Sequence, residues 1–148
     1  MAGLVLGAIV GCATLAKQAF REPTVALRDV RLVGLGVSGG ELEVDLSVYN
    51  PNHYQLDASR LRYRVFVGDS VGLAGGEMDA RTSVQPTDSA IVRIPVVFAY
   101  SGLTAAARQL LMTGTVNYRV TGEVSVASGV GYFTVPFSTT GRYNTMRR

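Results

Sequence analysis

The stretch from Leu42 to Tyr49 alternates apolar and polar residues without interruption, and this alternation restricts the fold more than any other feature of the chain. Successive side chains of an extended strand point to opposite faces, so the stretch predicts a strand with one face in a hydrophobic core and the other in water. Strands of this kind are typical of antiparallel sheets. The segment Asn50-Pro51-Asn52 follows directly, and proline flanked by asparagine predicts a turn that ends the strand.

Alternating segments recur along most of the chain. The other predicted strands cover residues 24–32, 61–67, 78–84, 91–100, 115–127 and 133–137. The phase of alternation changes between Leu27 and Val30, which predicts a β-bulge or a bend, and Pro95 predicts a strand at a sheet edge or a bulge. The glycine-rich stretch 71–76 is predicted as a flexible connection. About seven strands separated by turns predict an antiparallel β-sandwich.

One segment has the period of a helix instead. Its apolar residues lie at i, i+3, i+4, i+7 and i+8 and are Leu103, Ala106, Ala107, Leu110 and Leu111. These residues share one face of a predicted helix of about three turns, which starts near Ser101 or Gly102 and stops at Gly114. The predicted architecture is therefore mainly β with one short α-helix.

The charged residues favour a folded domain. They make up 17% of the chain, against an average of about 25%, and 47% of the residues are hydrophobic, so disorder caused by excess charge is excluded. The net charge is +3, and the tightest basic cluster is Arg60, Arg62 and Arg64. These arginines alternate with apolar residues, which predicts a solvated sheet face and no nucleic-acid partner. The alternative is a phosphate-binding stripe.

The first twelve residues resemble the signal peptide of a bacterial lipoprotein. A short apolar run ends in Ile9-Val10-Gly11-Cys12, which is similar to the lipobox whose cysteine accepts diacylglycerol. The resemblance implies cleavage before Cys12, with residues 1–11 as the signal peptide and residues 12–22 as a tether. Two acyl chains on the thioether and one on the amine anchor a protein stably where a single chain does not.

Ala13 follows the cysteine, and by analogy with lipoprotein sorting this implies an outer-membrane lipoprotein of the bacterial cell envelope that faces the periplasm. The alternative is an uncleaved apolar segment with an idle thiol at Cys12 and a cytoplasmic protein. No apolar stretch reaches the roughly 18 residues of a spanning helix.

The sequence offers no set of residues that would carry catalysis. His53 is the single histidine and Cys12 the single cysteine, so neither a nucleophile–base pair nor a site of several cysteines for a metal can be assembled. Glu41, Glu43 and Asp45 alternate along one strand, which predicts a charged outer face rather than an acid–base pair. We predict a protein that is not an enzyme, without catalytic residues, metal, cofactor or small-molecule substrate.

The order of the motifs resembles the late embryogenesis abundant type 2 family, whose module is called the water stress and hypersensitive response domain. The motifs are Pro23-x-Val25-x-Leu27, Val48-Tyr49-Asn50-Pro51-Asn52, Leu61-x-Tyr63-x-Val65, Ile94-Pro95-Val96-Val97-Phe98, the strand from Tyr118 to Val124, and Val135-Pro136-Phe137. The resemblance places the domain at residues 23–142 and leaves 143–148 as a tail. It implies an immunoglobulin-like or fibronectin-III-like sandwich, and a structural role for Asn50, Pro51 and Asn52.

The resemblance also implies a role in stress or desiccation tolerance. The functional hypothesis is a non-catalytic protection protein, anchored to a membrane by lipid, that makes weak contacts with destabilised client proteins or lipid surfaces. The alternative is a specific protein-binding or envelope-assembly module that recognises one partner through a strand edge or its loops.

Overall fold

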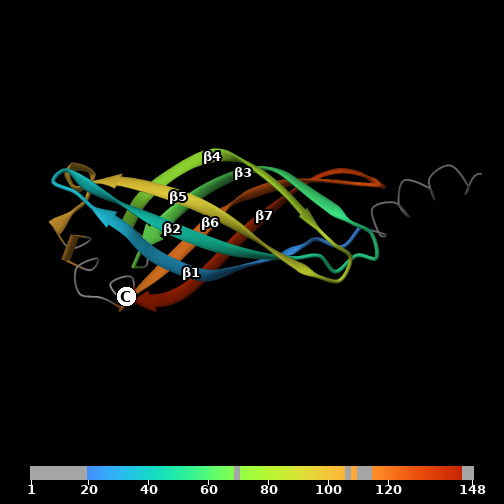
Figure 1. Ribbon diagram of the computed structural model, residues 1–148, viewed down its shortest axis with the longest axis horizontal. Coiled ribbons are helices and arrows are strands. Elements are labelled where there is room, and N and C mark those ends of the chain that lie inside the picture. The colour runs from blue at the N-terminus through green and yellow to red at the C-terminus, as the bar shows by residue number, and fades with distance from the viewer. Residues whose placement is uncertain (1–19, 69–70, 106–107, 110–114, 145–148) are drawn as a thin grey trace, which may run out of the picture.

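The structure is a computed structural model that describes residues 20–68, 71–105, 108–109 and 115–144 of this 148-residue chain. Within these ranges, seven strands form two antiparallel sheets that pack face to face (Figure 1). A 3-10 helix, η1 (Tyr100–Gly102), follows the fifth strand. The strands are β1 (Thr24–Leu35), β2 (Gly39–Tyr49), β3 (Leu56–Val67), β4 (Val71–Val84), β5 (Ser89–Ala99), β6 (Thr115–Ser128) and β7 (Gly131–Asn144).

The two sheets enclose one hydrophobic core. One sheet has the strand order β1-β2-β5 and the other has the order β4-β3-β6-β7. The apolar residues of β2 point into the core, as predicted, and all of them are buried: Leu42, Val44, Leu46 and Val48. Val65 of β3 belongs to the opposite side of the same core. The predicted antiparallel β-sandwich is confirmed.

The irregularity predicted in the first strand is also present. The pairing of β1 with β2 shifts register between Leu27 and Asp29, as a β-bulge requires. At this bulge the backbone of Leu27 bonds to the other sheet: its N–H donates to Thr139 Oγ1 at 2.7 Å, and its carbonyl accepts from the Tyr143 hydroxyl at 2.8 Å. The bulge therefore joins β1 to β7 along one side of the sandwich.

The prediction of a flexible connection at residues 71–76 is wrong. Strand β4 begins at Val71 and pairs with β3 through this stretch, with Gly75 opposite Arg64 and Gly76 opposite Tyr63. Glycine has no side chain, so a glycine-rich strand shows no apolar alternation although its backbone still forms the ladder. Pro95 lies in β5, which is an edge strand, as the sequence predicts.

The predicted helix falls partly outside the described residues, which omit 106–107 and 110–114. Ala105, Arg108 and Gln109 have helical backbone, and the N–H of Arg108 donates to the carbonyl of Thr104 at 3.0 Å. In the part of the chain that the structure describes, no helix has the length and apolar character needed to cross a membrane.

Candidate functional site

The turn between β2 and β3 contains two buried asparagines. Asn50 and Asn52 are 0% and 3% exposed, and they are the buried polar side chains of the described residues. Polar groups removed from water are stable only when they are hydrogen-bonded, so the partners of these side chains show what the turn does.

The side chain of Asn50 connects two turns. Its Nδ2 donates to the carbonyls of Tyr54 at 2.7 Å, Val84 at 3.1 Å and Gln85 at 3.3 Å. The backbone N–H of Asn50 donates to the carbonyl of Asp88 at 2.9 Å. The turn after β2 is thereby held against the turn between β4 and β5, at the end of the sandwich where both sheets meet.

The side chain of Asn52 holds the chain that enters β1. Its Nδ2 donates to the carbonyl of Arg21, and the N–H of Arg21 donates to its Oδ1, both at 2.8 Å. The Asn52 N–H and Nδ2 also donate to Asn50 Oδ1, at 2.9 and 3.0 Å. Next to this contact, the ring of Phe20 stacks on Phe133 with centroids 3.8 Å apart. The two asparagines thus form a clamp that holds together the turn after β2, the turn between β4 and β5, and the chain that enters β1. The polar atoms of both side chains are hydrogen-bonded to other groups of the protein.

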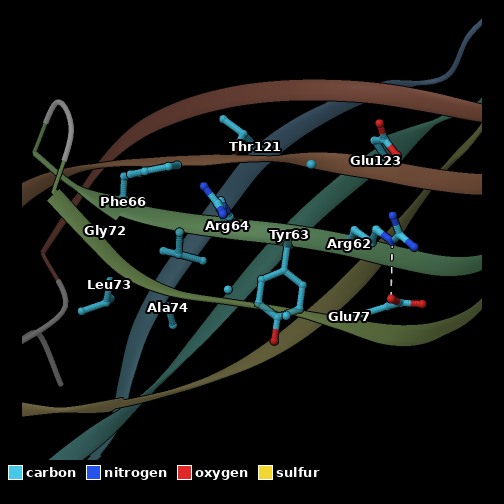
Figure 2. A pocket seen from close by; sticks show the side chains of 14 residues that line it. Arg62, Tyr63, Arg64, Phe66, Gly72, Leu73, Ala74, Glu77, Thr121 and Glu123 are labelled. Atoms are coloured by element: carbon cyan, nitrogen blue, oxygen red, sulfur yellow. Dashed lines mark ion pairs between the residues drawn. The ribbon is translucent and has the colours of Figure 1, made fainter. Parts of the chain in front are cut away.

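The outer face of the four-stranded sheet carries the predicted arginine cluster. Arg60 and Arg62 both lie close to Glu77 of β4, with Nε–carboxylate distances of 2.9 and 3.4 Å. Figure 2 shows Arg62 turned toward Glu77, whereas Arg64 lies farther along β3. Two of the three predicted residues therefore share one carboxylate, and Arg64 has no ion pair with any described residue.

A broad hollow lies over this part of the sheet. Its volume is about 940 Å³, and Arg64 and Phe66 lie on its floor beside the glycines of β4 (Figure 2). A Cβ added at Gly72 would meet no atom within 4 Å, so β4 is open to solvent at this residue. The charged residues that line the hollow are Arg62, Arg64, Glu77 and Glu123, so its cationic part lies at Arg64, away from the two carboxylates.

Strand pairing adds two further arginines to this face, one on each of the next two strands. The Arg119 guanidinium lies over the Phe66 ring, 4.7 Å from its centroid, and Arg119 is the residue of β6 paired with Phe66. Arg142 of β7 lies opposite Asn117 and lines a second hollow of about 450 Å³ together with Arg119. Arg64, Arg119 and Arg142 form the arginine diagonal, which crosses three neighbouring strands. The sequence pattern does not reveal this set, because each of the three arginines comes from a different strand and only the strand order shows that they are neighbours.

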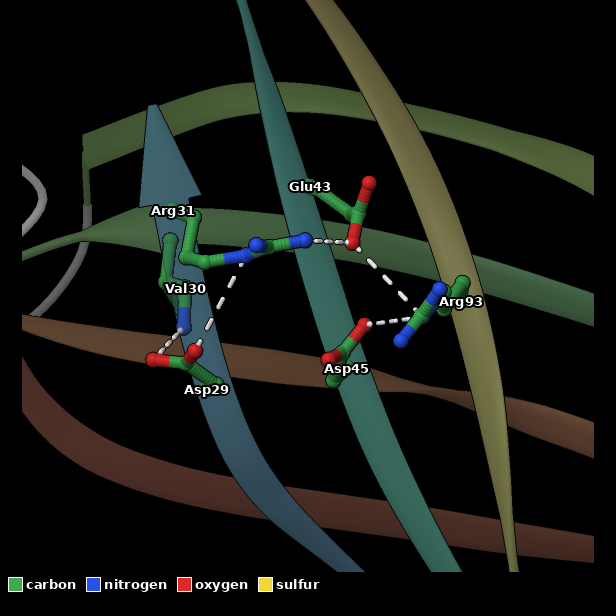
Figure 3. Close-up of polar contacts among 6 residues, drawn as sticks. All are labelled: Asp29, Val30, Arg31, Glu43, Asp45 and Arg93. Carbon is green, nitrogen blue, oxygen red and sulfur yellow. Dashed lines mark hydrogen bonds and ion pairs between the residues drawn. The ribbon is translucent and has the colours of Figure 1, made fainter. Parts of the chain in front are cut away.

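The outer face of the three-stranded sheet carries paired charges (Figure 3). Arg31 of β1 donates to Glu43 of β2, and this hydrogen bond with the charge of Glu43 raises the pKa of Arg31. Arg93 of β5 lies 3.6 Å from Glu43 and 3.5 Å from Asp45. Of the three carboxylates predicted as a charged outer face, Glu43 is therefore paired with arginines of both neighbouring strands and Asp45 with Arg93, whereas Glu41 forms no ion pair with a described residue.

Other titratable groups lie apart from one another. His53 is exposed in its turn, and the described residues contain no group of histidines, cysteines and acids that could hold a metal ion. The pKa of Asp57 is lowered by hydrogen bonds from Ser83 Oγ at 2.7 Å and Gln55 Nε2 at 2.8 Å, which keeps it a carboxylate. Burial raises the pKa of the Tyr54 hydroxyl. The predicted lipidation site, Cys12, lies outside the described residues.

Comparison with known proteins places these features in a family. The model of the late embryogenesis abundant protein family matches residues 45–141. A solution structure of an Arabidopsis thaliana protein has a TM-score of 0.69 at 23% identity, over 84% of this chain and 83% of that chain. The solution structure of a candidate late embryogenesis abundant protein has a TM-score of 0.60 at 18% identity, over 91% of this chain and 83% of that chain.

A crystal structure of an Archaeoglobus fulgidus protein has a TM-score of 0.52 at 17% identity, over 82% of this chain and 99% of that chain. At these identities the likeness to the three solved structures is one of fold. A search of curated proteins finds no match.

Proposed function

This chain belongs to the late embryogenesis abundant protein family, and on that premise we propose that it is a non-catalytic stress-protection protein, held at a bacterial membrane by its N-terminus. It makes weak, reversible contacts with destabilised proteins or lipid surfaces when water becomes scarce. The observation that carries the proposal is that a closed hydrophobic core lies beneath outer sheet faces that carry exposed ion pairs.

The charged faces support the proposal through the small free energy of each ion pair. Arg62 and Arg93 remain about two-thirds exposed in their pairs with Glu77 and Glu43. Exposed pairs of this kind contribute about 0–1 kcal/mol each, so their groups exchange readily for those of a neighbouring protein or lipid. The core needs no rearrangement for such an exchange, because every contact is made by outward-facing side chains.

The proposed anchor is consistent with the way the chain enters the sandwich. Arg21 is fixed by Asn52 and Phe20 by Phe133, so the tether is attached at the turn end of the domain. Residues 12–19 span at most about 26 Å when extended. A lipid on Cys12 would therefore keep the attachment end of the domain, at Phe20, within about this distance of the membrane surface.

A drying assay tests protection directly. A desiccation-sensitive enzyme is dried and rehydrated with the purified protein, with an equal mass of serum albumin, or alone. We expect more recovered activity with the protein than with albumin. Recovery equal to that with albumin contradicts the proposal.

A second candidate function is strand addition by one specific partner at β4. This edge is favoured because β4 is glycine-rich and its outer side faces away from β3, whereas β5, the corresponding edge of the other sheet, carries Pro95. Affinity capture from solubilised envelopes separates the two functions. One stoichiometric partner, lost when Gly75→Pro is introduced, favours strand addition, and a diffuse set of proteins favours the protective role.

A further inference from the structure

The arginine diagonal is a group of neighbouring arginines on one sheet face that have no matching negative charge. Within the described residues, Arg64, Arg119 and Arg142 form no ion pair, although seven other arginine–carboxylate contacts are present. The residues paired directly with Arg64, Gly75 and Thr121, are uncharged, and the nearest carboxylates on these strands, Glu77 and Glu123, lie opposite Arg62. The charges on this sheet are therefore segregated, with paired residues at one end and free cations at the other.

The guanidinium of Arg119 is held in place before any ligand arrives. It lies over the ring of Phe66, and its Nε is buried without a hydrogen-bond partner among the described atoms. A cation held over an aromatic ring keeps its charge and loses little side-chain freedom on binding. Neutral hydrogen-bonding residues surround it, since Asn117 and Thr140 line the same hollow. Cations with neutral donors are the groups that recognise phosphate oxygens.

We propose that the arginine diagonal binds the phosphate groups of anionic phospholipids. The inference rests on the proposed membrane-associated function and identifies the face of the domain that contacts the membrane. Diagonal neighbours on adjacent strands are about 7–8 Å apart, so one phosphate reaches at most two of the three arginines. A lipid surface presents many phosphates side by side, and it engages all three at once.

The same face fits nucleic acid poorly. Binding of single strands depends on open aromatic rings on which bases stack, and the ring of Phe66 is covered by Arg119. The basic surface is also interrupted beyond Arg64, because Glu77 and Glu123 lie opposite Arg62 on the two neighbouring strands. The phosphates of a long nucleic acid would therefore lose contact with the arginines after a few nucleotides.

Vesicle binding by the full-length protein tests the inference. Binding to phosphatidylcholine vesicles is compared with binding to vesicles that contain an equal amount of phosphatidylglycerol, at low salt, by cosedimentation. The difference between the two isolates the contribution of the anionic lipid, because the apolar N-terminus is the same in both. Each arginine near an anionic surface contributes a factor of about five, so R64Q/R119Q/R142Q is expected to lower the anionic partition coefficient roughly 100-fold.

The matched control is R60Q/R62Q/R93Q, which removes the same number of positive charges from arginines that are already ion-paired. We expect this control to change the partition coefficient less than about five-fold. Equal losses in both triple variants would show that only net charge matters and would overturn the inference. The melting temperature of each variant is measured first, and the three single substitutions replace any triple variant that fails to fold.

Two competition arms identify the source of the phosphate. Release from vesicles by millimolar inorganic phosphate, at constant ionic strength, would point to a site for free phosphate and overturn the lipid assignment. Tighter, diagonal-dependent binding to a single-stranded oligonucleotide would overturn it as well. The drying assay keeps the two proposals distinguishable. If R64Q/R119Q/R142Q binds anionic vesicles as tightly as the wild type does, and the wild-type protein still protects enzymes, the arginine diagonal is refuted and the protective function stands.

Discussion

Asn50 is the residue on which the turn end of the sandwich most depends. Its amide bonds to three carbonyls of two different segments, and its Oδ1 accepts from Asn52. In Asn50→Ala these buried partners lose their donor or acceptor without regaining water, so we expect the free energy of unfolding to fall by about 2–4 kcal/mol. Urea denaturation measures the change. His53→Ala, an exposed position in the same turn, is the control and should lie within about 0.5 kcal/mol of the wild type; equal effects would contradict the clamp.

Asp57 gives a pH-dependent prediction. Hydrogen bonds from Ser83 and then Gln55 lower its folded pKa below the ordinary value of 3.8, so its contribution to stability is present above that value and is lost as the pH falls through the lowered pKa. Ser83→Ala should raise the Asp57 pKa, as measured by NMR titration. The variant should be less stable than the wild type at neutral pH, and the part of this difference due to Asp57 should vanish in strong acid. The control is Thr82→Ala. The Thr82 hydroxyl donates to the carbonyl of Ala80 and not to Asp57, so its removal should leave the Asp57 pKa unchanged.

Among the elements, the contact between β3 and β6 depends on a glycine. A Cβ at Gly122 would collide with the backbone carbonyl of Arg62 on the neighbouring strand, and a backbone atom cannot move aside as a flexible side chain can. We expect Gly122→Ala to lower the free energy of unfolding by about 1–3 kcal/mol. Gly72→Ala on β4 is the matched control, because its Cβ enters open space, and it should be neutral or slightly stabilising. Thermal and urea unfolding measure both, and equal destabilisation would refute the close approach.

The elements differ in how well the sequence predicted them, for physical reasons. Strand β2 alternates strictly because one of its faces is buried and the other carries charges, so its pattern alone locates it. The start of β4 was missed because its glycines have no side chains to alternate. The arginine diagonal could not be found from the chain order, because Arg64 and Arg142 become neighbours of Arg119 only through the pairing of β3, β6 and β7. Periodicity reports burial within one strand, whereas a site on a sheet face depends on which strands are adjacent.

At the scale of the whole molecule, the proposed anchor and the arginine diagonal act on the same equilibrium. Three surface arginines give only weak membrane binding by themselves, and a tether raises the local concentration of lipid that they meet. The two signals together give the stable association that neither reaches alone. The domain can then exchange between lipid and nearby proteins while it stays at the membrane.

Substitution of the proposed lipidation residue separates these two contributions. In Cys12→Ala, expressed in a bacterium with lipoprotein processing, no acyl chain can be attached, so we expect the intact mass to lack the acyl groups carried by the wild type. We also expect most of the protein to move from the membrane fraction to the soluble fraction. The residual membrane-bound part should disappear at high salt, because surface ion contacts are screened there, whereas acylated wild type should resist the same wash. Wild-type protein of unmodified, full-length mass would contradict the anchor, and it would leave the arginine diagonal to be judged by vesicle binding alone.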